Sequence, residues 1–362
     1  MIKYSRIYQY ERKPIRSFIE EIFDYYDIYT AVMEHGRIII KPNLLTLSEK
    51  QEAVTTNPLI ADIVIELLRQ KTDKEIIIAE GASASYISMN ELFKKTGYSD
   101  IARKHSVKMV NLNTYPHFSR NGIRISSIVR EENPYIISLA KLKTHMLTKV
   151  TMAVKNMYGM LPAKYKLYYH SQNPDSSDFS RMVSRINNAI KPHFSIVDGI
   201  TAMEGNGPGN GDPVNAGIIA SSSSPFELDH FLIDFMGFDV KHIEYMQYGI
   251  ERGYYNGHYE IEEKPEPLHF ESPRVNKFDR LLKITKNNLV KHITANYPEI
   301  KEKTCRQCMK CCNICPVGSI VVRDGYPRVR TRKCIACYCC IETCPFDSII
   351  NRKSIVESII DV

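Results

Sequence analysis

The first 304 residues of this 362-residue chain contain no cysteine, and the whole chain contains no tryptophan. No apolar run approaches the ~20 residues that a membrane-spanning helix needs. Residues 1–13 carry five charged side chains with no apolar segment after them, which argues against a secretory signal. The 43% share of hydrophobic residues is that of an ordinary folded protein. From these absences we expect a soluble, cytoplasmic protein that does not bind membranes.

The ten cysteines of the chain all lie between Cys305 and Cys344. The spacing C-x2-C-x2-C-x3-C-P occurs twice, starting at Cys305 and again 29 residues later at Cys334, so this part is an internal duplication. In such a run three cysteines bind one iron–sulfur cluster and the fourth, before proline, binds the other cluster. The spacing therefore predicts two [4Fe-4S] clusters, the first with ligands Cys305, Cys308, Cys311 and Cys344 and the second with Cys334, Cys337, Cys340 and Cys315.

Over residues 302–352 this pattern resembles a bacterial-type ferredoxin module. Zinc is the main alternative, but structural zinc sites do not need the third closely spaced cysteine or the Cys-Pro pair. Disulfides are disfavoured because nothing indicates export and neighbouring cysteines bridge poorly. Cys312 and Cys339 remain outside the two quartets. We interpret them as small buried residues beside a cluster, although Cys312 could replace Cys311 as a ligand.

Basic residues also concentrate in this part of the chain. Residues 301–353 contain eleven Lys and Arg against four Asp and Glu, and the net charge of the whole chain is +7. Eight thiolates with two oxidised clusters would lower that charge by about four, which disfavours nucleic-acid binding. A hairpin turning at Asp324-Gly325 is expected, and its basic side chains form either a solvated face or a docking surface for an acidic redox partner protein. These side chains are Arg323, Arg328, Arg330, Arg332 and Lys333.

The first 264 residues show short Ile- and Val-rich runs that alternate with helical patterns. This alternation predicts an α/β domain with a mostly parallel sheet and flanking helices, in addition to the small C-terminal α+β iron–sulfur domain. Ligands of such sheets bind at the carboxyl ends of the strands. The strands are expected at residues 37–40, 75–79, 107–110, 135–138 and 194–197, and the helices at residues 58–69, 178–190 and 225–236.

Polar motifs follow these strands at residues 41–45, 80–83, 141–145 and 198–199, and further motifs occupy residues 155–159 and 204–209. Taken as a set, the motifs resemble the domain-of-unknown-function family 362 over residues 35–240. The resemblance implies an architecture and candidate positions but no reaction. No P-loop and no dinucleotide-binding glycine fingerprint is present, so an ordinary NTPase or NAD enzyme is not supported.

Lysines beside glycine-rich backbone suit an anionic ligand such as a carboxylate or phosphate, whereas the carboxylates with His145 could instead hold a metal ion or serve acid/base chemistry. Each residue alone has an ordinary structural explanation, and the argument for a site rests on their shared position at the strand ends. The candidate anion pocket consists of Lys41, Asn43, Glu80, Lys141, Lys143, Asn156, Asp198 and Asn206. The candidate catalytic residues are Lys143, His145, Lys155 and Glu204.

We expect four segments: the α/β domain at residues 1–264, a linker with a helical arm at 265–301, the iron–sulfur domain at 302–352 and a tail at 353–362. The main functional hypothesis is an iron–sulfur oxidoreductase that passes electrons to an anionic substrate or cofactor in the α/β domain. Two hypotheses of another class remain open. One is a non-catalytic electron carrier whose large domain docks partner proteins, and the other is a scaffold that delivers a metal or cluster.

Overall fold

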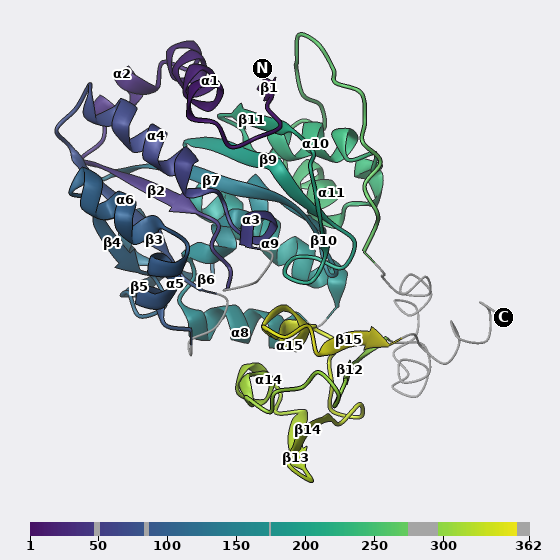
Figure 1. Cartoon of the computed structure of the whole chain (residues 1–362). Helices are drawn as coiled ribbons and strands as arrows, with labels where there is room; N and C mark the ends of the chain where they lie inside the picture. Colours follow the sequence, from purple (N-terminus) through teal and green to yellow (C-terminus); the bar gives the residue numbers. More distant parts are fainter. Residues whose placement is uncertain (47–50, 83–86, 174, 274–295, 353–362) are drawn as a thin grey trace.

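A nine-stranded sheet flanked by helices forms the body of the protein (Figure 1). The computed structural model describes residues 1–46, 51–82, 87–173, 175–273 and 296–352. Residues 274–295 of the linker and helical arm predicted at 265–301, and the predicted tail at 353–362, lie outside the described residues. No helix within the described ranges is long and apolar enough to cross a membrane.

The five strands predicted from sequence are the five parallel strands at the centre of the sheet. In the strand order β1-β11-β9-β7-β2-β3-β4, all pairs from β9 to β4 are parallel, while β1 and β11 are antiparallel at one edge and β8 and β10 add short antiparallel pairs. The strands are β1 (Lys3–Arg6), β2 (Arg37–Pro42), β3 (Glu75–Glu80), β4 (Lys108–Asn111), β7 (Pro134–His145), β8 (Lys149–Thr151), β9 (Phe194–Glu204), β10 (Asp212–Val214) and β11 (Ile218–Ser222). A separate hairpin pairs β5 (His117–Arg120) with β6 (Ile123–Ser126).

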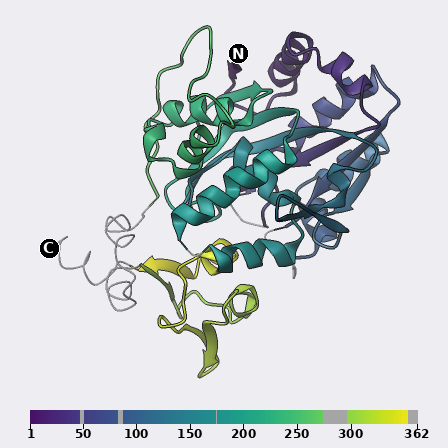
Figure 2. The ribbon, with the colours of Figure 1, turned by 180° about the vertical axis from the view of Figure 1, so that it is seen from behind.

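Alternate residues of the parallel strands enter two separate hydrophobic cores. Ile38 and Ile40 pack on one face of the sheet while Ile39, between them, packs on the other, as the period of two in a strand requires. The first core contains α1 (Arg12–Tyr25), α2 (Ile28–Met33), α4 (Pro58–Arg69), α5 (Met89–Lys95) and α6 (Tyr98–His105). The second core contains α7 (Ala153–Asn156), α9 (Ser176–Ile190), α10 (Pro225–Phe235) and α11 (Glu244–Glu251), with α9 in front in the reverse view (Figure 2).

Helix α4 begins where the sequence predicts it. The Asn57 side chain accepts a hydrogen bond from the Leu59 N–H at 3.0 Å, and Pro58 occupies the first helical position. Helices α9 and α10 also confirm the predicted helical segments. The remaining short helices are α3 (Gln51–Val54), α8 (Ala163–Gln172), η1 (Ser127–Val129), η2 (Met157–Met160) and η3 (Val240–His242).

The chain order of the parallel strands reverses between β2 and β7. From β2 the chain builds β3 and β4 on one side, and it then returns to place β7 and β9 on the other side of β2. At such a reversal the chain segments that follow the two strands lead away from each other, which leaves a crevice at the carboxyl ends of the two strands. The fold therefore has its favoured ligand position between the ends of β2 and β7.

The cysteine-rich region, residues 296–352, lies beneath this end of the sheet (Figure 1). Two short antiparallel pairs and two short helices form it, and the hairpin predicted at Asp324-Gly325 is confirmed by the pairing of β13 with β14. Its elements are β12 (Tyr297–Ile300), α14 (Lys310–Ile314), β13 (Ile320–Arg323), β14 (Tyr326–Val329), α15 (Cys339–Glu342) and β15 (Ile349–Arg352).

The duplication seen in the sequence recurs in the backbone of this region. Gln307 and Met309 adopt left-handed conformations with φ of 53° and 57°, and their counterparts 29 residues later, Ala336 and Tyr338, have φ of 51° and 57°. Because residues other than glycine rarely adopt positive φ, the same unusual turn in both copies indicates two equivalent cysteine loops.

Candidate functional site

A cavity of about 690 Å³ of empty space, open at its mouth, lies between the carboxyl ends of the parallel strands and the cysteine-rich region. Strands β2, β3 and β7 form one wall, helices α7 and α8 form the sides, and helix α15 forms the wall opposite the sheet. The cavity thus coincides with the reversal between β2 and β7. The chemically active side chains that line it are Lys41, Asn43, Glu80, Lys143, Lys155, Asn156, Lys166, His170 and Glu342.

Two of the lysines are fixed by the ends of the strands. Lys41 Nζ donates to Glu80 Oε2 at 2.8 Å, and both side chains are almost fully buried. Lys143 Nζ donates to Asn43 Oδ1 at 2.8 Å and to the Val54 carbonyl at 2.7 Å. Burial holds the pKa of Lys143 well below its usual value. These lysines have partners within the protein, so the strand ends present them in fixed positions.

Asn156 joins the two strand ends through three hydrogen bonds. Its Nδ2 donates to the Lys41 carbonyl at 3.1 Å and to Ser138 Oγ at 2.9 Å, while its Oδ1 accepts from Asn43 Nδ2 at 3.2 Å. Gly159 follows closely, and a Cβ placed there would lie 2.7 Å from Glu80 Oε1. Asn156 and Gly159 of the motif at residues 155–159 are therefore explained by close packing at the ends of β2 and β3.

Helix α8 contributes two side chains that we did not predict. Lys166 and His170 are four residues apart and so lie on the same side of the helix, facing the cavity. Lys166 Nζ donates to the Gly81 carbonyl at 2.5 Å and the Ala82 carbonyl at 3.0 Å, and burial lowers its pKa to about 7. His170 stacks on Phe179 with ring centroids 4.3 Å apart, and burial lowers the pKa of His170 to about 3. The spacing of four residues between this lysine and this histidine is the feature of the sequence that could have identified the pair.

Lys155 differs from the other three lysines in its surroundings. Its ammonium group lies 5.8 Å from the centre of the Tyr158 ring and 5.9 Å from that of Phe179, and no hydrogen-bond acceptor holds it among the described residues. Burial lowers the pKa of Lys155 to about 8. This ammonium is available to a molecule in the cavity.

Glu342 is the acidic group that the cysteine-rich region brings to the cavity. Its Oε1 lies 3.4 Å from His145 Nε2, and neither atom makes a hydrogen bond within the described part of the chain. His145 does not itself line the cavity, and its Nδ1 accepts from the backbone N–H of Leu147 at 3.0 Å. Burial raises the pKa of Glu342 to about 7 and holds that of His145 well below its usual value. His145 thus lies behind the wall that Glu342 forms.

Besides His145, four of the predicted candidates lie outside the cavity lining. Lys141 Nζ donates to Asp198 Oδ2 and to the Tyr10 hydroxyl, each at 2.8 Å, and the Lys141 and Asp198 side chains are fully buried. Glu204 accepts a hydrogen bond from the backbone N–H of Glu271 at 2.8 Å, and Asn206 does not line the cavity. Lys141 and Asp198 therefore have a structural explanation as a satisfied buried ion pair.

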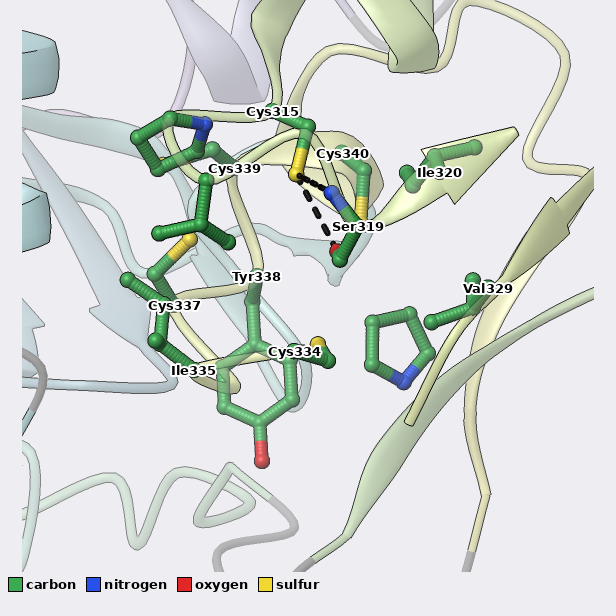
Figure 3. Close-up of a pocket in the computed structure, with 13 residues that line it drawn as sticks. Cys315, Ser319, Ile320, Val329, Cys334, Ile335, Cys337, Tyr338, Cys339 and Cys340 are labelled. Atoms are coloured by element: carbon green, nitrogen blue, oxygen red, sulfur yellow. Dashed lines mark hydrogen bonds between the residues drawn. The ribbon is translucent and has the colours of Figure 1, made fainter. Parts of the chain in front are cut away.

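Two further cavities lie within the cysteine-rich region, and each is lined by one of the predicted quartets. The first, of about 320 Å³, is lined by Cys305, Cys308, Cys311 and Cys344. The second, of about 300 Å³, is lined by Cys315, Cys334, Cys337 and Cys340 (Figure 3). Each copy of the motif thus gives its fourth cysteine to the cavity of the other copy. Among the described residues, no three or more His, Cys, Asp or Glu side chains are grouped to hold a single metal ion.

The cysteine sulfurs also accept hydrogen bonds of the kind that stabilise thiolates. The Ser319 backbone N–H and hydroxyl both lie 3.1 Å from Cys315 Sγ (Figure 3), and the Gln307 N–H lies 3.4 Å from Cys305 Sγ. Of the two extra cysteines, Cys312 lines neither cysteine cavity. Cys339 lines both the second cysteine cavity and the cavity with the four lysines described above, which we call the cationic cavity. Only a short stretch of α15 therefore separates these two spaces.

The model of the family described as "Domain of unknown function (DUF362)" matches residues 38–234, more than half of the chain. The chain belongs to the DUF362 family. A curated relative, the thylakoid-associated protein sll1697 of Synechocystis sp., is 32% identical over 208 residues, which are 56% of this chain and 64% of the relative. The chain thus matches less than two thirds of that protein's length.

Among solved structures, a crystal structure of a Thermotoga maritima protein from a structural genomics consortium is 14% identical to this chain. The match covers 56% of this chain and 53% of the other, with a TM-score of 0.32.

The DUF362 match includes most of the cavity but not all of it. The four lysines, Glu80 and His170 lie within residues 38–234, whereas Glu342 and Cys339 lie in the cysteine-rich region beyond the match. In this DUF362 protein the site is therefore completed by a segment outside the family domain. Glu342 was missed because its position within C-x3-C is occupied by Asn313 in the first copy, and a single charged residue between ligands gives no recognisable pattern.

Proposed function

We propose that this DUF362 protein is an iron–sulfur oxidoreductase that delivers electrons through two [4Fe-4S] clusters to an anionic substrate or cofactor. The observation that carries the proposal is the interleaved pair of cysteine cavities, because each contains one complete set of four cysteines. The interleaving is the arrangement expected of a two-cluster ferredoxin module. The first cluster would be held by Cys305, Cys308, Cys311 and Cys344, and the second by Cys315, Cys334, Cys337 and Cys340.

Bound clusters of this type supply one-electron transfer. A cluster with four thiolate ligands has no open position for a substrate, so chemistry on a substrate needs a separate site. The cationic cavity provides such a site, and Cys339 lies on the wall that it shares with the second cysteine cavity. In this proposal the lysines of the cavity bind and orient the anion, and helix α15 keeps it beside the second cluster.

The second candidate function is that of an electron carrier or cluster-delivery scaffold, and the basic hairpin favours it. An open hollow on this hairpin is lined by Val321, Arg323 and Arg328 and by residues 330–333, which follow β14. The basic side chains of the hollow would attract an acidic redox partner protein from solution. They are Arg323, Arg328, Arg330, Arg332 and Lys333. A partner surface is compatible with either function, whereas the cationic cavity has no role in a simple carrier.

The cytoplasmic location expected from the sequence remains a proposal. The relative in Synechocystis is named thylakoid-associated, and we infer that the basic hairpin would allow this chain to associate with a membrane only through an acidic partner protein.

The proposal is tested by anaerobic purification, iron analysis and EPR spectroscopy after reduction. We expect about eight irons per chain and the signals of two interacting [4Fe-4S] clusters. Because Cys344 belongs to the first quartet, Cys344→Ala should disturb the cluster that residues 305–311 hold and leave the second intact. Cys312→Ala serves as the matched control, since Cys312 lines neither cavity. Stoichiometric zinc without iron would refute the redox function.

A further inference from the structure

We propose that the cationic cavity binds a small molecule with two negative charges, a phosphate monoester or a dicarboxylate, and that Lys155 is its principal contact. The inference rests on the proposed function, which requires an anionic ligand, and it adds the charge of that ligand and the residue that selects it. Four observations support it, beginning with the charges that the cavity contains.

The cavity contains more positive than negative side chains. Lys41, Lys143, Lys155 and Lys166 line it, and the opposing carboxylates are Glu80 and Glu342. Burial lowers the pKa of these lysines, and a bound anion would favour their charged forms. When all six groups are ionised, two positive charges of the lining have no counterpart among its carboxylates. Charges removed from water are stable only when they are paired, so an excess of this size is best neutralised by a ligand with two negative charges.

The second observation is the unequal engagement of the four lysines. Glu80 pairs with Lys41, Asn43 and the Val54 carbonyl accept from Lys143, and two backbone carbonyls accept from Lys166. Within the described ranges, no hydrogen-bond acceptor engages the Lys155 ammonium, which lies 5.8 and 5.9 Å from the centres of two aromatic rings and interacts with the charge of Glu342. A ligand oxygen would give Lys155 the charge-assisted hydrogen bond that the other lysines already make.

The third observation is a buried polar atom of a residue that lines the cavity. His170 Nδ1 makes no hydrogen bond in the described part of the chain, and His170 is more than nine-tenths buried. Buried polar atoms normally have a partner. A ligand in the cavity would supply this partner, whereas Glu342 Oε1, which also makes no hydrogen bond in the described ranges, lies 3.4 Å from His145 Nε2.

The fourth observation is the place of the cavity. Its position, at the reversal between β2 and β7, is the place where parallel α/β sheets bind ligands. Charge, the unpartnered histidine nitrogen and position thus identify the same space.

The test is isothermal titration calorimetry on the anaerobically purified full chain, with four salts at matched ionic strength. Inorganic phosphate and succinate represent the two dianion chemistries, and chloride and acetate are the monovalent controls. We expect binding of phosphate or succinate at least tenfold tighter than that of either monoanion. The preferred dianion then distinguishes a phosphate ester from a dicarboxylate. Equal binding of all four salts, or no binding of either dianion, would overturn the proposal.

Variants then assign the contact. Lys155→Met should weaken dianion binding at least tenfold, and Lys155→Arg, which keeps the charge, should restore it to within a few-fold of the wild type. Lys164→Met is the matched control, because Lys164 is an exposed lysine on α8, two residues before the buried Lys166. Wild-type affinity in folded Lys155→Met would contradict the assignment. Should that variant not fold, the selectivity of the wild type for dianions still decides the outcome.

Iron analysis of the same samples keeps this proposal distinct from the redox function. Eight irons per chain without dianion binding would refute the ligand and leave the redox function standing. Dianion binding to a chain that takes up no iron would refute the redox function and leave the ligand proposal standing.

Discussion

Lys166 is buried, and burial disfavours the charged form of its side chain. Its pKa is lowered to about 7, mainly by burial, while Glu80 on β3 raises it and Lys41 on β2 and Lys155 on α7 lower it further. His170, Lys143 and Glu342 face the same cavity. In the unfolded chain this lysine titrates near its ordinary pKa of 10.5, so between pH 7 and 10.5 the unfolded state binds more protons. The free energy of unfolding should therefore rise with pH across this window.

Lys166→Met tests this expectation because it removes the titrating group and keeps the length of the side chain. In chemical denaturation between pH 6.5 and pH 10, the wild type should gain stability relative to the variant by at most about 1.4 kcal/mol per pH unit. Lys164→Met, on the exposed side of the helix, should run parallel to the wild type. A constant difference between the wild type and Lys166→Met would show that Lys166 titrates normally.

The lysines of β7 show what sequence reasoning at the residue scale can and cannot supply. A regular strand places Lys141 and Lys143 on the same face, and both are candidates from their position near the strand end. The pairing of β7 with β9 shifts register between these two residues, and Tyr10, from the N-terminal segment, reaches Lys141. Lys143 therefore lines the cavity, whereas Lys141 forms a buried ion pair with Asp198. A bulge and a contact with a residue 131 positions away leave no periodic signal in the sequence.

At the scale of elements, the sequence predicted the central sheet well because its strands, except the edge strand β4, are buried on both faces. Continuous Ile- and Val-rich runs are typical of such strands, and β2, β3 and β4 begin within one residue of the prediction. Strands β7 and β9 extend seven residues beyond the predicted ends, to His145 and Glu204. The polar residues expected after these strands lie within them, because ion pairs and the cavity allow lysine and aspartate inside the sheet.

The start of α4 offers a direct test of local helix signals. Asn57 Oδ1 accepts from the Leu59 N–H, and its own backbone N–H donates to Asp198 Oδ2 at 2.9 Å. Asn57→Ala removes only the first of these bonds, so the free energy of unfolding should fall by about 1 kcal/mol. Asn57→Ser retains a capping oxygen and should lose less. Denaturant titration measures both, and an unchanged midpoint for Asn57→Ala would show that the backbone bond alone fixes the helix start.

At the scale of the whole molecule, the cationic cavity is a product of two regions distant in the sequence. The α/β domain supplies the lysines, and the cysteine-rich region supplies α15, whose Ile341 carbonyl accepts from Asn210 Nδ2 at 3.2 Å. This shared wall could not be predicted from the sequence, because nothing in the sequence of residues 334–344 indicates that they contact residues 41–170. The family resemblance found the domain that contains most of the site, and the structure added the segment that closes it.

A shared wall predicts coupling between the clusters and the ligand. Removing iron with a chelator should loosen α15 and so weaken dianion binding by at least about fivefold, the lower end of usual allosteric coupling. By reciprocity, phosphate should raise the chelator concentration needed to remove half of the iron. Calorimetry on iron-loaded and iron-free chains, together with visible absorption, measures both effects. Equal phosphate affinity in the two forms would show that the cavity does not depend on the clusters.

The exchange of Cys315 and Cys344 between the two motifs has a consequence for biosynthesis. During translation the first three cysteines, Cys305 to Cys311, emerge early, but the fourth residue of their cavity is the last cysteine of the chain. Neither cavity can be completed by one motif alone. In the proposed iron–sulfur form, a ribosome-bound chain that ends before Cys344 lacks the fourth ligand of the first cluster, so we expect that cluster to be completed only after the whole duplicated segment has been synthesised.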